Sequence, residues 1–274
     1  MKQTKPLKKK AQQKAKSRKM TPAEIIRSLK KDERITLAKT KMGRVLDHFL
    51  YVIELRANNA FVVHSDVLTS QIPQSFAANA FNVFQRSMHQ IEIVRLCALW
   101  DGVDPDKENI PTVIELIDDP DIIEALAEET RSYHATMGGR VFKSGDEDEE
   151  MLAQALEASN AQFGAEQAER VRTELNGAIK AARVISKSER LSSVMNIRDK
   201  HLAHSLTETR REKKKTIRPM TWGDGTDLFE SSIPIVEGLY CWVAGKSFSI
   251  ADSQRIDQEN AEALWKGCKF EVLY

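Results

Sequence analysis

The chain has 274 residues, and 41 basic against 40 acidic side chains give it a formal net charge of only +1. Nine of the basic residues and none of the acidic ones fall within residues 1–20, which leaves 32 basic against 40 acidic residues in the rest. With 41% hydrophobic residues the acidic body can bury a core, so a globally disordered chain is excluded.

The composition also argues against membrane and secreted proteins. The longest stretch without Asp, Glu, Lys or Arg, residues 67–85, contains Pro73 and several polar side chains, so it is not expected to span a membrane. The basic N-terminus has no apolar segment behind it, which argues against a signal peptide. Three widely separated cysteines fit neither a disulfide framework nor a thiolate zinc site. We therefore expect a cytoplasmic protein without membrane contact.

The N-terminal half predicts a flexible arm followed by long helices. Residues 1–20 form a Lys, Gln and Ala tract with little to bury, which either binds nucleic acid non-specifically or only aids solubility. Thr21-Pro22-Ala23-Glu24 is typical of a helix start, and a single helical domain is expected over residues 21–274. Apolar residues recur every three or four positions in residues 44–64 and 76–100, which predicts two long helices that pack antiparallel.

Shorter helices follow in the middle of the chain. One is predicted from Pro111 and another from Pro120 to about residue 133, before a break at Gly138-Gly139. The five consecutive acids at residues 146–150 favour a helix N-terminus, and the helical pattern then continues to Ile185.

The C-terminal part is also helical in pattern. A helix is predicted from Ser188 to about Leu206, then a basic connection over residues 209–222, and two more helices over 227–245 and 252–267. Because neither strand alternation nor a βαβ pattern occurs, the sequence predicts an all-α bundle with long antiparallel helices and additional C-terminal helices.

The helix predicted from Ser188 carries a charge on its apolar side. At about 100° per residue, Arg198 falls within the stripe of apolar side chains, which comprises Leu191, Val194, Met195, Leu202 and Leu206. A desolvated guanidinium without a partner costs several kcal/mol, so Arg198 needs either a buried acid or a polar cleft. The same projection places His201 beside Arg198 and His204 at the edge of the stripe.

The string Arg198-Asp199-Lys200-His201-Leu202-Ala203-His204 resembles the Arg, polar residue, spacer, His motif of the HEPN superfamily of helical ribonucleases. Together with an upstream helix ending Ile93-Val94-Arg95-Leu96-Cys97-Ala98-Leu99-Trp100-Asp101, it resembles the abortive-infection AbiU-type branch, with a HEPN-like core over about residues 44–267. Trp100 and Asp101 themselves are expected to be packing and capping residues.

The resemblance implies metal-independent RNA cleavage, in which a 2′-hydroxyl attacks the neighbouring phosphate and leaves a cyclic phosphate. His204 would transfer protons, and Arg198 would stabilise the charge that develops on the phosphate. Asp199 is a supporting residue that orients Arg198 or caps hydrogen bonds, and His201 is either a second proton-transfer group or a polar residue packed beside Arg198. A homodimer is implied because one Arg and one His make a sparse site, and an antitoxin or regulatory partner would fit phage defence or toxin–antitoxin biology.

Basic side chains in and after the motif either follow an RNA backbone or form a solvated loop. They are Lys200, Arg210, Arg211, Lys213, Lys214 and Lys215. His201 and His204 could instead ligate a metal, but no nearby Cys or third His supports this, so neither a metal nor another cofactor is expected. The rival hypothesis is a non-catalytic helical module that binds nucleic acid or a protein partner through the same groove.

Overall fold

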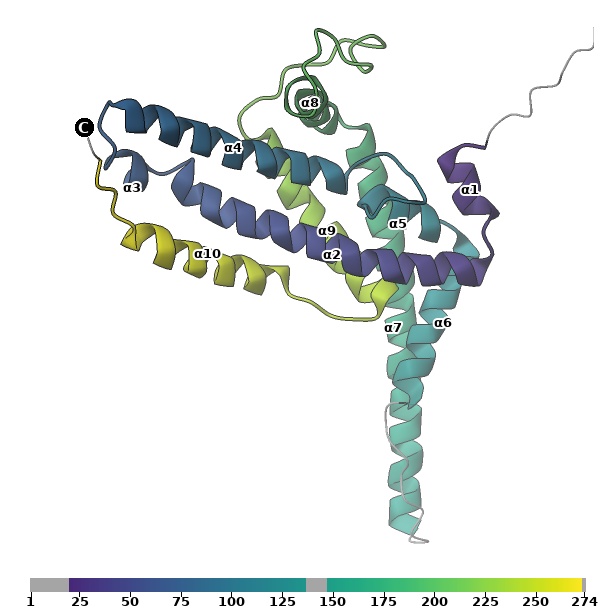
Figure 1. Cartoon of the computed structure of the whole chain (residues 1–274). Coiled ribbons are helices and arrows are strands. Elements are labelled where there is room, and N and C mark those ends of the chain that lie inside the picture. Colours follow the sequence, from purple (N-terminus) through teal and green to yellow (C-terminus); the bar gives the residue numbers. More distant parts are fainter. Residues whose placement is uncertain (1–19, 137–146, 273–274) are drawn as a thin grey trace, which may run out of the picture.

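The computed structural model describes residues 20–136 and 147–272, so the basic arm, apart from Met20, and the expected break at Gly138-Gly139 lie outside the described residues. Within these ranges all regular elements are helices, which confirms the all-α prediction (Figure 1). They are α1 (Pro22–Ser28), α2 (Lys31–Val62), α3 (Asp66–Thr69), α4 (Phe76–Leu99), α5 (Ile110–Ile117), α6 (Pro120–Thr136), α7 (Glu147–Lys187), α8 (Glu189–Ile197), a π-helical turn η1 (Arg198–Leu202), α9 (Asp224–Ala244) and α10 (Ile250–Gly267).

Side-chain caps fix where several helices begin. The Thr21 hydroxyl accepts a hydrogen bond from the Glu24 N–H at 3.2 Å, and the Glu24 carboxylate accepts one from the Thr21 N–H at 2.7 Å. Ser75, Asn109 and Ser188 cap α4, α5 and α8 in the same way, through side-chain oxygens that accept backbone N–H groups. Each cap satisfies a donor that the helix cannot pair internally, so these predicted starts agree with the structure.

The long helix α2 lies at the centre of the bundle and contacts α4, α5, α9 and α10. It runs antiparallel to α4, as the sequence predicts (Figure 1). The helix begins at Lys31, well before the predicted start at residue 44. Its first turns bury two cations, Arg34 and Lys41, beside Ala38 and Met42, so the apolar pattern there is interrupted. Arg34 and Lys41 are both only 5% exposed.

These buried cations connect α2 to the polypeptide around α5. Arg34 donates from Nε to the Leu116 carbonyl at 3.0 Å and from Nη1 to the Asp119 carboxylate at 2.9 Å. Lys41 Nζ donates to the carbonyl of Lys107 at 2.9 Å, in the loop between α4 and α5. Because buried cations are tolerated only with such partners, α2 determines where this loop lies.

Helices α6 and α7 pack along one another and extend away from the layer formed by α2, α4 and α10 (Figure 1). Gly164 of α7 is buried against α6, and a Cβ added there would lie 2.6 Å from the carbonyl oxygen of Arg131. A glycine at this position therefore permits the two backbones to approach more closely than any side chain would allow.

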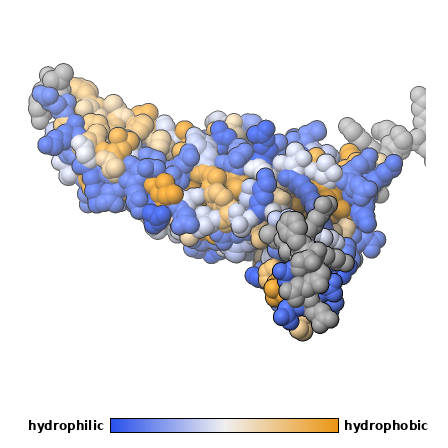
Figure 2. Space-filling model, turned by 90° about the horizontal axis from the view of Figure 1, so that it is seen from below, coloured by the Kyte–Doolittle hydropathy of each residue, from blue (hydrophilic) through white to orange (hydrophobic). Residues whose placement is uncertain are grey.

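Polar side chains cover most of the face shown in Figure 2, with apolar ones gathered toward the end of the molecule where α4 begins and α10 ends. Phe76 at the start of α4 and Leu264 near the end of α10 are 95% and 58% exposed. Among the described helices, none has both the length and the apolar character needed to cross a bilayer.

Phe49 of α2 and Phe229 of α9 stack at the centre of the core, with ring centroids 5.1 Å apart and ring planes at 4°. We expect Phe49→Ala to lower the free energy of unfolding by about 3–5 kcal/mol, because Phe49 is fully buried and its loss leaves a cavity. Phe76→Ala should change it by less than about 0.5 kcal/mol, since Phe76 is 95% exposed. Urea unfolding of both variants measures the contrast, and equal effects would contradict the assigned core.

Candidate functional site

The segment with the Arg and His motif is not one regular α-helix. Helix α8 ends at Ile197, and η1 follows as a π-helical turn in which the Ala203 N–H donates to the Arg198 carbonyl at 2.8 Å. The prediction of an α-helix to Leu206 is therefore wrong beyond Ile197. The wider turn invalidates the angular positions computed for His201 and His204, and Leu206 is 41% exposed instead of buried.

Arg198 lies between two carboxylates at the start of η1, with 16% of its side chain exposed. Its Nη1 donates to Asp101 Oδ1 at 2.5 Å, and its Nε and Nη2 donate to Asp199 Oδ1 at 2.9 and 2.7 Å. Asp101 follows the C-terminal end of α4, so two distant parts of the chain meet at this guanidinium. The interpretation of Asp101 as a simple capping residue missed this ion pair.

Two further cations extend the pairs around Arg198. Lys107 Nζ lies 3.3 Å from Asp101 Oδ2, and Arg211 Nε lies 3.6 Å from Asp199 Oδ2. Burial opposes the charge on Arg198, but its hydrogen bonds to Asp101 and Asp199 outweigh this effect and raise the pKa of the guanidinium. Each Nη atom keeps a second hydrogen for which no described residue is a partner. Arg198 is thus always charged, fixed in orientation and still able to donate.

Cys97 is fully buried near this ion-pair network, and its Sγ lies 3.7 Å from the carbonyl oxygen of Val194. Burial raises the pKa of the Cys97 thiol to about 12, against the opposing effect of Arg198. Cys97 therefore stays protonated at neutral pH and is unsuited to nucleophilic chemistry. Across residues 20–136 and 147–272, no group of three or more His, Cys, Asp or Glu side chains is arranged to hold a metal ion.

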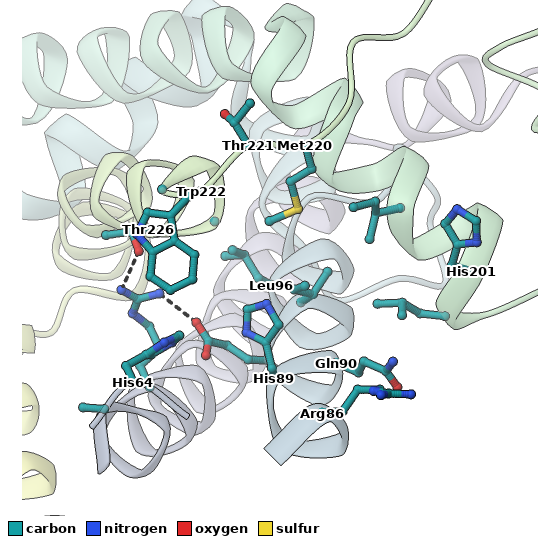
Figure 3. Close-up of a pocket in the computed structure, with 18 residues that line it drawn as sticks. His64, Arg86, His89, Gln90, Leu96, His201, Met220, Thr221, Trp222 and Thr226 are labelled. Carbon is teal, nitrogen blue, oxygen red and sulfur yellow. Dashed lines mark hydrogen bonds and ion pairs between the residues drawn. The ribbon is translucent and has the colours of Figure 1, made fainter. Parts of the chain in front are cut away.

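The two histidines of the motif lie in different surroundings. His201 lines a cavity of about 570 Å³ between η1, α2 and α4 (Figure 3). His204 lies beyond the π-helical turn; like His201 it is exposed and forms no hydrogen bond with the described residues. Within the described part of the chain, Arg198 thus pairs with Asp101 and Asp199, and no hydrogen bond links it to either histidine.

Glu212 fixes the loop that follows the motif. Its carboxylate accepts hydrogen bonds from Lys200 Nζ at 2.9 Å, Asn196 Nδ2 at 3.0 Å and the Thr209 N–H at 2.8 Å. These bonds, with that of Lys200 first, lower the pKa of Glu212 to about 2. These contacts tie the loop to Asn196 at the end of α8 and to Lys200 in η1.

The basic side chains predicted to bind RNA separate into two groups. Arg210, Arg211, Lys214 and Lys215 line a shallow groove of about 690 Å³, together with Lys187, Ser186, Ser192 and Asp199. Lys213 is exposed outside this groove, and Lys200 is neutralised by Glu212. Of the groove cations, Arg211 pairs with Asp199, whereas no described acid pairs with the other arginine or the lysines. The groove therefore combines uncompensated positive charge with direct contact to Asp199.

We expect Glu212→Gln to loosen residues 198–216, because an amide cannot replace the charge that holds Lys200. The stabilisation by Glu212 is fully present above its ordinary pKa of 4.5 and is lost as the pH falls toward about 2. The variant should therefore melt below the wild type at pH 7, and the difference should shrink below pH 4.5.

Thermal melts across this pH range, with hydrogen exchange of residues 198–216, measure the effect of Glu212→Gln. Glu208→Gln is the matched control, since Glu208 is an exposed acid of the same loop. A difference in melting temperature that did not depend on pH would show that the charge of Glu212 is not what anchors the loop.

The comparisons with known proteins point to one family. The model of the AbiU2 family, a HEPN family, matches residues 39–264, which include α4, the Arg198 network and the basic groove. Comparison with curated proteins and with solved structures found no match. Since the match covers most of the chain, this protein belongs to the AbiU2 family of HEPN proteins.

Proposed function

We propose that this protein is a metal-independent endoribonuclease that acts in the cytoplasm in phage defence or in a toxin–antitoxin pair. One observation carries the proposal: within the region matched by the AbiU2 family, a charged arginine with spare N–H donors is followed six positions later by an exposed imidazole. These are the two kinds of group that phosphoryl transfer without a metal requires. A nuclease of this kind needs restraint, so an antitoxin or regulatory partner is part of the proposal.

In the proposed reaction, a ribose 2′-oxygen forms a bond to the adjacent phosphorus while the bond from phosphorus to the 5′-oxygen breaks. His204 either accepts the proton of the 2′-hydroxyl or gives one to the leaving 5′-oxygen, and water or the His204 of a second copy makes the other transfer. The exposure of His204 allows it to exchange protons with water. The remaining N–H groups of Arg198 bind the non-bridging oxygens, on which negative charge increases. The products are a 2′,3′-cyclic phosphate and a 5′-hydroxyl.

Neighbouring groups position the substrate and the guanidinium. Asp101 and Asp199 hold Arg198 so that its free hydrogens have a fixed direction, as a preorganised phosphate site requires. The groove formed by Arg210, Arg211, Lys214 and Lys215, with Lys213 nearby, supplies charge for the RNA backbone. Lys200 contributes less in this arrangement, since Glu212 neutralises it. His201, which lines the adjacent cavity, is either a second proton-transfer group or a polar residue that supports the site.

A homodimer would supply a second Arg and His, and α4 offers a surface for it. Phe84, Ile91 and Val94 are 41%, 42% and 37% exposed, and they recur at intervals of seven and three residues on the side of α4 opposite the core. Ala80, Ser87 and Ala98 continue this spacing, which is typical of a seam between paired helices. Because α4 leads directly into Asp101, such a seam would belong to the same element that positions Arg198.

We expect the purified protein to cleave RNA in the presence of chelator and to leave cyclic phosphate ends. Arg198→Ala and His204→Ala should each lower the cleavage rate by about 100-fold or more, because they remove phosphate stabilisation and proton transfer. End-group analysis and single-turnover rates measure both effects. Circular dichroism verifies folding, and His48→Ala on α2 is the control for loss of a histidine elsewhere.

Undiminished cleavage by folded His204→Ala would remove His204 from the mechanism. If the wild type binds RNA but never cleaves it, the non-catalytic binding module becomes the better description. A larger loss of rate in His201→Ala than in His204→Ala would transfer the proton-transfer role to the histidine in the cavity.

We expect Ile91→Glu to convert the dimer to a monomer, because it places a charge in the centre of the apolar seam on α4. Sedimentation equilibrium of the variant and the wild type measures the change in mass. Val184→Glu is the control, since Val184 is 64% exposed on α7 and lies outside the seam. An Ile91→Glu protein with the mass of the wild type would exclude α4 as the interface.

A further inference from the structure

A cavity beside η1 has no role in the proposed cleavage step. It has a volume of about 570 Å³ and lies between α2, α4, η1 and the segment that leads into α9. Figure 3 shows aromatic rings on one side of it, from Trp222, His64 and His89, and His201 on the opposite side. A volume of this size suits a ligand as large as a nucleotide.

Trp222 presents an unusually open aromatic surface at this cavity. It is 86% exposed, and its ring meets that of His64 edge to face, with centroids 5.2 Å apart and planes at 88°. His89 meets His64 in a similar way, at 6.0 Å and 86°. An exposed indole held beside two imidazoles is a platform on which another flat ring can stack.

The charge of the cavity favours an anionic ligand. Glu92 is already paired with Arg56, whose Nη1 donates to its carboxylate at 2.7 Å, and Asn59 donates to the same carboxylate at 2.6 Å. Arg86 also lines the cavity, and no acid of the described residues pairs with it. Among the described residues, the single carboxylate that lines the cavity is thus neutralised, while one guanidinium stays available for a phosphate.

Polar atoms at the cavity can recognise the edge of a base. His89 Nδ1 is buried without a hydrogen-bond partner among the described residues, and the Gln90 amide lines the same wall. Burial lowers the pKa of His64. The charges of His89 and Arg56 lower this pKa further, whereas the charge of Glu92 raises it. A neutral imidazole both donates and accepts hydrogen bonds, as the edges of nucleobases do.

We propose that this cavity binds one unpaired nucleotide, with its base stacked on Trp222 and its phosphate at Arg86. This inference rests on the proposed function for the source of the nucleotide, an RNA single strand. His201 and Leu202 of η1 line the cavity, so a base held there would lie next to the turn that carries Arg198. Stacking on aromatic side chains with a nearby cation is the usual way in which proteins hold unpaired bases.

The test measures binding without cleavage. A fluorescein-labelled 2′-O-methyl RNA decamer has no free 2′-hydroxyl, and AMP, GMP, CMP and UMP test the free nucleotides. We expect Trp222→Ala to weaken binding of the decamer by about 5- to 100-fold, as loss of one stacked base predicts, and Trp222→Phe to retain most of it. Arg86→Ala should weaken the decamer and the nucleotides, but should leave binding of adenosine, which lacks phosphate, unchanged.

Matched controls separate the cavity from general surface effects. Phe76→Ala removes an exposed aromatic ring at the start of α4. Arg95→Ala removes an arginine on another face of α4, whose Cζ lies 5.2 Å from the ring centroid of Tyr51 in α2. Both should bind like the wild type. If Trp222→Ala and Arg86→Ala also bind like the wild type, the inference is overturned.

The ligands also distinguish the source of the nucleotide. Binding of mononucleotides that depends on Trp222, without binding of the decamer, would support the nucleotide site and count against the proposed ribonuclease. Binding of the decamer that depends on Trp222, in a protein that never cleaves RNA, would support the site and refute only the catalytic proposal.

Discussion

The ion pairs of Arg198 with Asp101 and Asp199 are the constraint on which the arrangement of the site depends. A guanidinium that is mostly removed from water is stable only with partners, and removal of one partner from a buried pair typically costs about 3–5 kcal/mol. The cost at Arg198 is smaller, because 16% of its side chain and 26% of that of Asp101 remain exposed. The pairs nevertheless fix the end of α4 against η1. Lys107, in the loop after α4, pairs with Asp101, and Arg211, in the loop after η1, pairs with Asp199.

The position of Asp101 is itself determined in the core. Trp100, the preceding residue, is 2% exposed and donates from Nε1 to the Ser232 hydroxyl of α9 at 2.9 Å. Asn109 donates to the carbonyl of Asp101 at 3.2 Å, and Lys41 of α2 holds the carbonyl of Lys107. Packing of α2 and α9 therefore places the loop after α4, the loop places Asp101, and Asp101 places Arg198. A change in the packing of Trp100 would therefore displace Asp101 and with it the guanidinium of Arg198, although residues 198–204 themselves were unchanged.

Much of the fold follows from local patterns, whereas the site depends on contacts between distant segments. Apolar periodicity predicts α4, and the position of Arg198 on an apolar stripe predicts that it needs a buried acid or a polar cleft. The structure supplies two acids, Asp101 and Asp199. Asp101 is not predicted as that acid because 97 positions separate it from Arg198 and no local pattern relates the two. The π-helical turn is not predicted, because apolar spacing does not distinguish a regular α-helix from a short wider turn within it. The cavity at Trp222 is lined by α2, α4, η1 and the segment before α9, and the spacing of apolar residues does not predict that these segments lie close together.

The near balance of total charge conceals how the chain distributes its cations. Glu212 neutralises Lys200 and Glu92 is paired with Arg56, whereas Arg86 and the lysines of the basic groove form no ion pair with a described acid. Arg198 is different from both groups, because it is paired and yet keeps hydrogens that point to no described partner. In the proposed reaction a phosphate binds Arg198 without breaking either ion pair, and the carboxylates that neutralise Arg198 also supply the rigidity that such a site requires.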